Sequence, residues 1–108
     1  MTNSEIAIPV PPDDDVVSHR VTLTNMRGLH ARASAKFINC AEKFDAEIEV
    51  SAHNDCSFDT VVADSIMELL MLGAACGEEI TITCRGPEAQ LALQDLLALI
   101  ARNFDEEA

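Results

Sequence analysis

The chain has 108 residues, which is enough for a single domain with one hydrophobic core. Hydrophobic residues make up 48% of the sequence, but the aromatic side chains are limited to four phenylalanines, so the core is predicted to be aliphatic. The formal net charge of −12 argues against binding to nucleic acid or to anionic membrane surfaces, because like charges repel. A partner protein with a basic patch would be attracted instead.

Neither a zinc site nor a redox motif is indicated by the four cysteines, because no two of them have C-x-x-C spacing; they are Cys40, Cys56, Cys76 and Cys84. The first residues lack the basic region and the long apolar run of a signal peptide. The longest apolar run, at residues 69–76, is too short to span a membrane. We therefore expect a cytoplasmic monomer with reduced thiols, no nucleic-acid partner and no membrane insertion.

Residues 1–17 are predicted to form a disordered tail. Prolines at positions 9, 11 and 12 block regular structure, and the acidic run at residues 13–15 repels itself. A solvated tail is favoured over a partner-binding arm. Residues 18–108 are predicted to form one domain without internal repeats.

Alternating hydrophobicity predicts four strands. The first begins at Val17, and its inward face is expected to carry Val17, His19, Val21 and Leu23. The other three are expected at residues 46–52, 58–62 and 80–84.

Three helices are predicted from the spacing of apolar residues. The first spans residues 31–43, and its core side comprises Ala33, Phe37, Cys40, Ala41 and Phe44. The third spans residues 87–103, with Pro87 at its first position and a charged, frayed end at residues 105–107. Its apolar stripe consists of Ala89, Ala92, Leu93, Leu96, Ile100 and Phe104.

The second predicted helix opens at Asp64 or Ser65 and carries six apolar residues between positions 66 and 72. That is more apolar surface than one buried face needs. Either part of it is an exposed docking patch, or the helix is short and tightly enclosed. With this helix, the element order is strand–helix–strand–strand–helix–strand–helix. The fold class is α+β, with a four-stranded antiparallel sheet and three helices on one face.

The stretch that carries chemistry is Gly28-Leu29-His30-Ala31-Arg32, between the first strand and the first helix. It places an imidazole at a helix N-terminus, where unpaired N–H groups and the helix dipole favour an anion. The Arg32 guanidinium could hold phosphoryl oxygens without a metal. No nucleotide-binding loop or Ser/His/Asp set accompanies the histidine, so the chain could carry a phosphoryl group but not take one from ATP. The alternative is a surface histidine in a turn.

This segment, followed by residues 33–37 (Ala-Ser-Ala-Lys-Phe), resembles the phosphorylation site of HPr, the histidine-containing phosphocarrier family of the bacterial phosphotransferase system. Asp64-Ser65-Ile66-Met67 with residues 69–73 resembles the second signature of that family, around its regulatory serine, and residues 77–82 resemble the strand that follows. The resemblance covers residues 18–104 and implies the open-faced β-sandwich of the family.

The resemblance also implies roles for individual residues. His30 would accept a phosphoryl group from the phosphoenolpyruvate-dependent enzyme I, on the ring nitrogen nearer the backbone, and pass it to an EIIA-type acceptor. Arg32 would assist the phosphohistidine, and Ser65 would be phosphorylated by an HPr kinase/phosphorylase. The implied partner-docking residues are Ala31, Ala33, Ile66, Met67, Leu70 and Met71. Such a protein is a phosphocarrier without cofactor or metal, not a stand-alone enzyme.

Three departures from the family pattern qualify these roles. Ala33 stands where sugar-transport members usually have proline, which favours the nitrogen-related or regulatory branch. His30 and Ser65 are a few residues further apart than is typical, and Asp64 would repel a phosphate on Ser65. Ser65 could instead be a helix cap, and the whole chain could be a regulatory docking module that acts through the second helix without phosphotransfer. A metal site built from His53, Asp55 and Cys56 is disfavoured, because a second ligand pair is missing.

Overall fold

The structure is a computed structural model of the chain, and it describes residues 15–53, 60–63, 65–72 and 74–106. Most of the predicted tail and the turn that contains Asp55, Cys56 and Phe58 lie outside the described residues. The division of the chain into a tail and a domain therefore stays a prediction. None of the described helices is long and apolar enough to cross a lipid bilayer.

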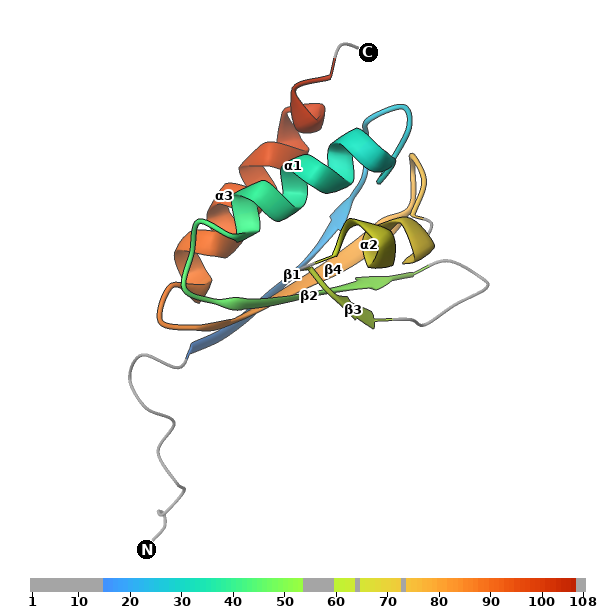
Figure 1. Cartoon of the computed structure of the whole chain (residues 1–108). Coiled ribbons are helices and arrows are strands. Elements are labelled where there is room, and N and C mark those ends of the chain that lie inside the picture. Colours follow the sequence, from blue (N-terminus) through green and yellow to red (C-terminus); the bar gives the residue numbers. More distant parts are fainter. Residues whose placement is uncertain (1–14, 54–59, 64, 73, 107–108) are drawn as a thin grey trace, which may run out of the picture.

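Four antiparallel strands form one sheet in the order β1-β4-β2-β3 (Figure 1). The strands are β1 (Asp15–Thr22), β2 (Glu47–Ala52), β3 (Thr60–Val62) and β4 (Glu79–Gly86). In the central pair, Ile82 lies opposite Val50 and Cys84 lies opposite Ile48, and all four side chains are buried. The predicted alternation of buried and outward residues is therefore confirmed for β2 and β4.

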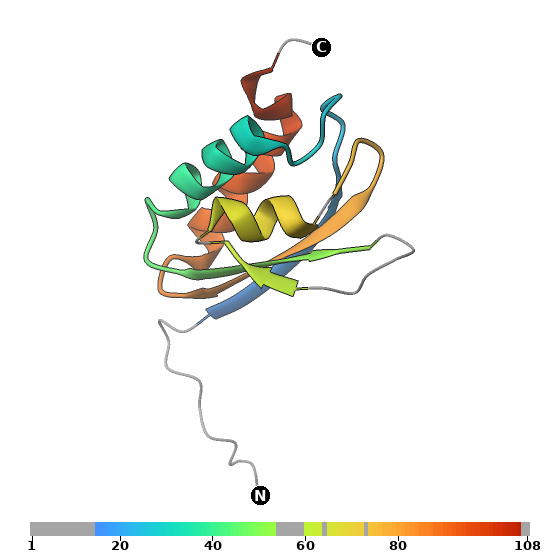
Figure 2. The same ribbon diagram turned by 45° about the vertical axis from the view of Figure 1, so that its right-hand side comes forward.

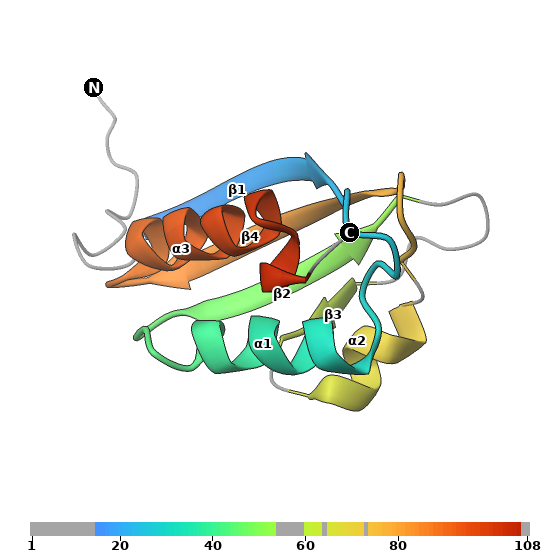
Figure 3. The same cartoon turned by 90° about the horizontal axis from the view of Figure 1, so that it is seen from above.

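Three helices cover a single face of this sheet: α1 (Ala31–Ala41), α2 (Ile66–Leu72) and α3 (Ala89–Ala101) (Figures 1 and 2). Seen from above, α3 lies over β1 and β4, and α1 lies beside α3 (Figure 3). The whole apolar stripe predicted for α3 is buried, as are four of the five residues predicted for the core side of α1. The α+β class and the order of the elements are confirmed.

Several predicted boundaries are wrong by a few residues. β1 begins at Asp15, because its pairing with β4 extends to Gly86. His19 shares its register position with buried Ile82 but is exposed, because β1 is an edge strand. Pro87 lies in a turn rather than in α3, whose N-cap is Glu88. The Glu88 backbone N–H donates to the Asp45 carbonyl at 3.1 Å, and this bond holds the turn before the helix begins.

The end of α3 departs most from the sequence prediction. Three consecutive non-glycine residues adopt positive φ, namely Asn103 (56°), Phe104 (56°) and Asp105 (60°), and they form the short turn η1 (Asn103–Asp105). Each left-handed residue costs about 1–2 kcal/mol. Burial of the Phe104 ring offsets this cost, and the Lys36 ammonium donates to the Phe104 carbonyl at 2.8 Å. The predicted continuation of the helix to residue 103 is therefore wrong.

Candidate functional site

His30 lies at the N-cap of α1, at the end of a loop that leaves little freedom. Gly28 has φ +61°, and a side chain there would come within 2.4 Å of the Ala74 carbonyl oxygen. The Leu29 N–H donates to the same carbonyl at 3.0 Å. The loop after β1 is thereby fixed against the segment between α2 and β4, and His30 is held at the helix entrance.

The N-terminus of α1 presents unpaired donors. The first hydrogen bond within the helix runs from the Ser34 N–H to the His30 carbonyl at 2.8 Å. The N–H groups of Ala31, Arg32 and Ala33 precede it and have no acceptor within the helix. Together with the helix dipole, they make the space beside the His30 ring favourable for an anion.

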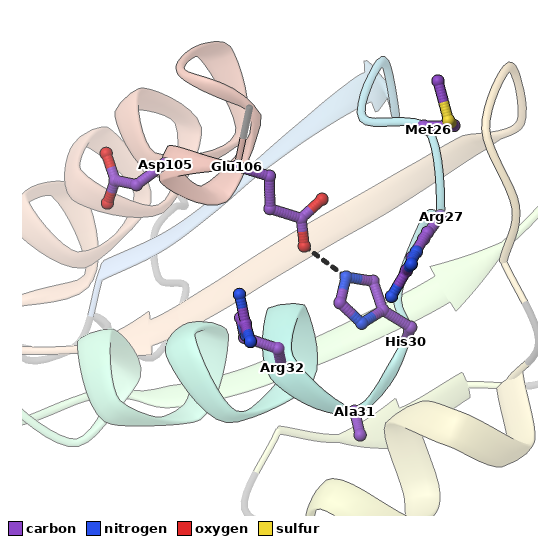
Figure 4. A pocket seen from close by; sticks show the side chains of 7 residues that line it. All are labelled: Met26, Arg27, His30, Ala31, Arg32, Asp105 and Glu106. Atoms are coloured by element: carbon purple, nitrogen blue, oxygen red, sulfur yellow. Dashed lines mark hydrogen bonds and ion pairs between the residues drawn. The ribbon is translucent and has the colours of Figure 1, made fainter. Parts of the chain in front are cut away.

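The His30 ring contacts a residue from the far end of the sequence. Its Nε2 forms a hydrogen bond with Oε2 of Glu106, which directly follows η1 (Figure 4). The other oxygen, Oε1, accepts a hydrogen bond at 3.1 Å from Nδ2 of Asn25, whose amide also donates to the Gly28 carbonyl at 2.7 Å. Asn25 is buried, so Glu106 is fixed by the same loop that positions His30.

The protonation of Glu106 follows from its partners. Burial raises the pKa of Glu106, but hydrogen bonds from His30 and Asn25 and the electrostatic attraction of His30 and Arg27 lower it by more. The net pKa is below the usual value for a glutamate, and the carboxylate is ionised at neutral pH. An ionised carboxylate only accepts hydrogen bonds, so the proton of the shared bond is on Nε2.

Two arginines face the same open pocket as His30 (Figure 4). Its lining consists of Met26, Arg27, His30, Ala31, Arg32, Asp105 and Glu106. Arg27 comes from the loop, and Arg32 comes from the first turn of α1. Within the described part of the chain, neither guanidinium belongs to an ion pair. Both are therefore placed to receive an anion in this pocket.

Comparison with known proteins agrees with this geometry. The family model described as the PTS HPr component phosphorylation site matches residues 17–102. The chain belongs to the HPr family. Its members are phosphocarriers of the phosphotransferase system rather than stand-alone enzymes.

Similar HPr proteins match over most of their length. The phosphocarrier protein HPr of Cupriavidus necator is 42% identical over 85 residues, which cover 79% of this chain and 91% of that protein. The phosphocarrier protein NPr of Shewanella violacea is 40% identical over 91 residues, covering 83% and 94%. The crystal structure of HPr-C-His from Thermoanaerobacter tengcongensis matches with a TM-score of 0.77 and 33% identity, covering 85% of this chain and 99% of that chain.

The HPr fold brings together three of the predicted site residues, because His30, Ala31 and Arg32 all line the pocket. Ala33 does not join them. It was predicted to contact partners, but it is fully buried on the core side of α1, so that prediction is wrong.

The second signature lies on α2, outside the pocket. The Ser65 hydroxyl accepts a hydrogen bond from the Glu68 N–H at 3.4 Å, which is the helix-cap role considered as the alternative for this serine. Leu70 is exposed, whereas Leu69 and Leu72 are buried, so each interpretation of the apolar excess holds for part of the helix. The side chains of the other predicted docking residues, Ile66, Met67 and Met71, lie outside the described residues.

The sequence analysis missed five residues of the site: Met26, Arg27, Asp105 and Glu106, which line the pocket, and Asn25, which holds Glu106. Arg27 lies only three residues before His30, so its proximity was a usable signal. Glu106 had no local signal, because the contact joins positions 76 residues apart and depends on η1. The charged end predicted to fray is instead ordered at Asp105 and Glu106.

Metal binding receives no support from the described residues, which contain no group of three or more His, Cys, Asp or Glu side chains able to hold an ion. The disfavoured site at His53 includes Asp55 and Cys56, which lie outside the described residues. His53 itself is exposed, and its Nε2 lies 2.6 Å from the Thr81 hydroxyl.

Proposed function

We propose that this HPr protein accepts a phosphoryl group on Nδ1 of His30 from phosphorylated enzyme I and passes it to an EIIA-type acceptor. The observation that carries the proposal is that the two nitrogens of the His30 ring have different partners. Nε2 is bound to Glu106, which leaves the Nδ1 lone pair for attack on phosphorus. The N-cap position places this ring at the entrance of α1, beside the unpaired N–H groups.

The pocket suits a phosphoryl group because its donors surround that entrance. The backbone N–H groups at the start of α1 and the guanidinium of Arg32 supply hydrogen bonds and positive charge. Arg27 adds a second cation on the loop side (Figure 4). The residues of the pocket supply no means of taking a phosphoryl group from ATP. The phosphoryl group is therefore received from one protein and delivered to another.

Docking of those proteins is assigned to the exposed apolar side chains near the pocket. Ala31 and Met26 line the pocket, and Met26 is 74% exposed. Leu70 on α2 is also exposed. Phosphorylation of Ser65 by an HPr kinase/phosphorylase stays a prediction, and so does service in a regulatory branch, for which Ala33 is the supporting feature.

The test is phosphorylation by enzyme I and phosphoenolpyruvate. The parent protein should acquire one acid-labile phosphate, and His30→Ala should acquire none. His53→Ala is the matched control, because it removes an exposed imidazole away from the pocket and should label as the parent does. Labelling of His30→Ala at the parent rate would contradict the proposal. If the parent failed to label but still bound a partner, the docking-module alternative would gain support.

A further inference from the structure

We propose that Glu106 is a positioning residue for phosphotransfer, which holds the proton on Nε2 of His30 and stabilises the positive charge that the ring acquires when Nδ1 is phosphorylated. This inference rests on the proposed function and assigns a role to a side chain outside the phosphorylation-site motif. The geometry that carries it is the chain of contacts from His30 through Glu106 to Asn25.

The carboxylate is held at both oxygens. Oε2 faces His30 Nε2, and Oε1 accepts from the Asn25 amide, whose other bond goes to the Gly28 carbonyl. Both neighbours of that amide are acceptors, so its NH₂ group must face them. Because Asn25 is buried, Glu106 meets a fixed donor rather than a mobile surface group. The Glu106 side chain is itself only 13% exposed, so water screens the contact with His30 incompletely.

The backbone delivers Glu106 to this position. The left-handed turn η1 ends the helical path of α3, and the side chain of Glu106, which follows the turn, points towards His30 at the start of α1 (Figure 4). Two further bonds hold the turn: the Thr24 hydroxyl donates to Asn103 Oδ1 at 2.6 Å, and Lys36 donates to the Phe104 carbonyl. The contact with His30 is thus supported by the loop after β1 and by α1, both of which hold the turn that follows α3.

The proposed phosphoryl transfer conserves atoms and charge. The Nδ1 lone pair of neutral His30 attacks the phosphorus of the enzyme I phosphohistidine, forming one N–P bond while the donor N–P bond breaks. The departing electron pair stays on the donor imidazole, and the Nε2 proton of His30 remains in place. The product ring carries a phosphoryl group on Nδ1 and a proton on Nε2, so it has gained a positive charge. A carboxylate at Nε2 stabilises that charge as it forms.

The same carboxylate would repel a phosphoryl group that approached it closely. The two groups are kept apart because they occupy different nitrogens of the ring, and Nε2 is the one that faces Glu106 (Figure 4). Arg27 and Arg32 line the pocket and offset the remaining repulsion. Glu106 therefore favours the charged ring more than it disfavours the phosphate.

The experiment compares Glu106→Gln, Glu106→Ala and the control Glu42→Gln with the parent protein. Glu42 is an exposed acid at the opposite end of α1, so its replacement changes the net charge equally without touching the pocket. Initial rates of phosphorylation by enzyme I are measured over a range of carrier concentrations. Nitrogen-15 NMR of the imidazole reports which ring nitrogen of His30 carries the proton, a property that a merely structural role for Glu106 would not change.

The rate at saturating carrier should fall about tenfold for Glu106→Gln and Glu106→Ala. A further variant, Glu106→Asp, keeps the negative charge and should show a smaller loss. His30 should carry its proton on Nε2 in the parent and in Glu42→Gln, and exchange between both nitrogens in Glu106→Ala. Parent-like rates and an unchanged tautomer in the Glu106 variants would overturn the inference, as would an equal loss in Glu42→Gln. Those results would leave the proposed function intact, because that function depends on the separate loss of labelling in His30→Ala.

Discussion

At the entrance of α1, individual residues are held more tightly than the local sequence indicates. The motif around His30 indicated from the sequence the side chain that we propose to react, together with Arg32, because glycine, histidine and arginine at that spacing carry their chemistry locally. The exclusion of Ala33 from the surface was equally readable, since it shares the apolar side of the helix with Phe37. The need for glycine at position 28 was not readable, because it depends on the Ala74 carbonyl from a distant loop.

This dependence predicts a difference between two glycines that both have positive φ. Gly28→Ala should lower the free energy of unfolding by about 2 kcal/mol or more, because the new methyl group meets backbone at 2.4 Å as well as a strained φ. Gly77→Ala has the strained φ, but no atom of the described residues lies within 4 Å of its added carbon, so about 1 kcal/mol is expected. Urea unfolding of both variants measures the difference, and equal losses would contradict the steric argument.

Helices could be predicted from the helical spacing of their apolar residues, but the turn η1, which interrupts that spacing after α3, could not. The stripe of α3 continues through Phe104 at helical spacing, so the sequence alone favours one unbroken helix. The chain leaves the helix without a glycine or proline to signal it, and the left-handed turn is held by tertiary contacts of Phe104 and Asn103. Local propensity contains none of these contacts, and so the position of Glu106 could not be predicted.

The turn should therefore depend on the Phe104 ring. Phe104→Ala is expected to cost about 3–5 kcal/mol, because it removes a fully buried ring that offsets the left-handed backbone. Phe44→Ala is the control, since that ring is only half-buried beyond the other end of α1, and it should cost about 1–2 kcal/mol. Chemical denaturation gives both values. At low temperature, where Phe104→Ala is still folded, its phosphorylation rate should fall like that of Glu106→Ala.

The molecule as a whole follows from its sequence more securely than its site does. Four alternating segments and three amphipathic ones leave few arrangements, and pairing with β4 buries the inward residues of β2, whereas those of the edge strand β1 are only partly buried or exposed. The prediction that Cys40 fills the core is confirmed, and Cys84 is buried as well. Folding of the whole domain shields the thiols of Cys40 and Cys84 from solvent.

Thiol reactivity should report that protection. Burial raises the pKa of the Cys84 thiol to about 11, and burial with the nearby Asp95 charge raises that of Cys40. Because the thiolate is the reactive form, both should resist alkylation at pH 8, whereas exposed Cys76 should react much faster. Peptide mass spectrometry at timed intervals distinguishes the sites, and urea should make all of them reactive. Alkylation of Cys84 as fast as Cys76 in native buffer would show that the core opens readily.

The contact between His30 and Glu106 also has a consequence for synthesis on the ribosome. The histidine emerges early, but its carboxylate partner and the buried Phe104 are made after almost every other residue of the sheet and helices. A nascent chain that has formed the sheet still has an incomplete pocket, with the imidazole lacking its acceptor. Among the described residues, the pocket is therefore completed last, after the sheet and all three helices have been synthesised.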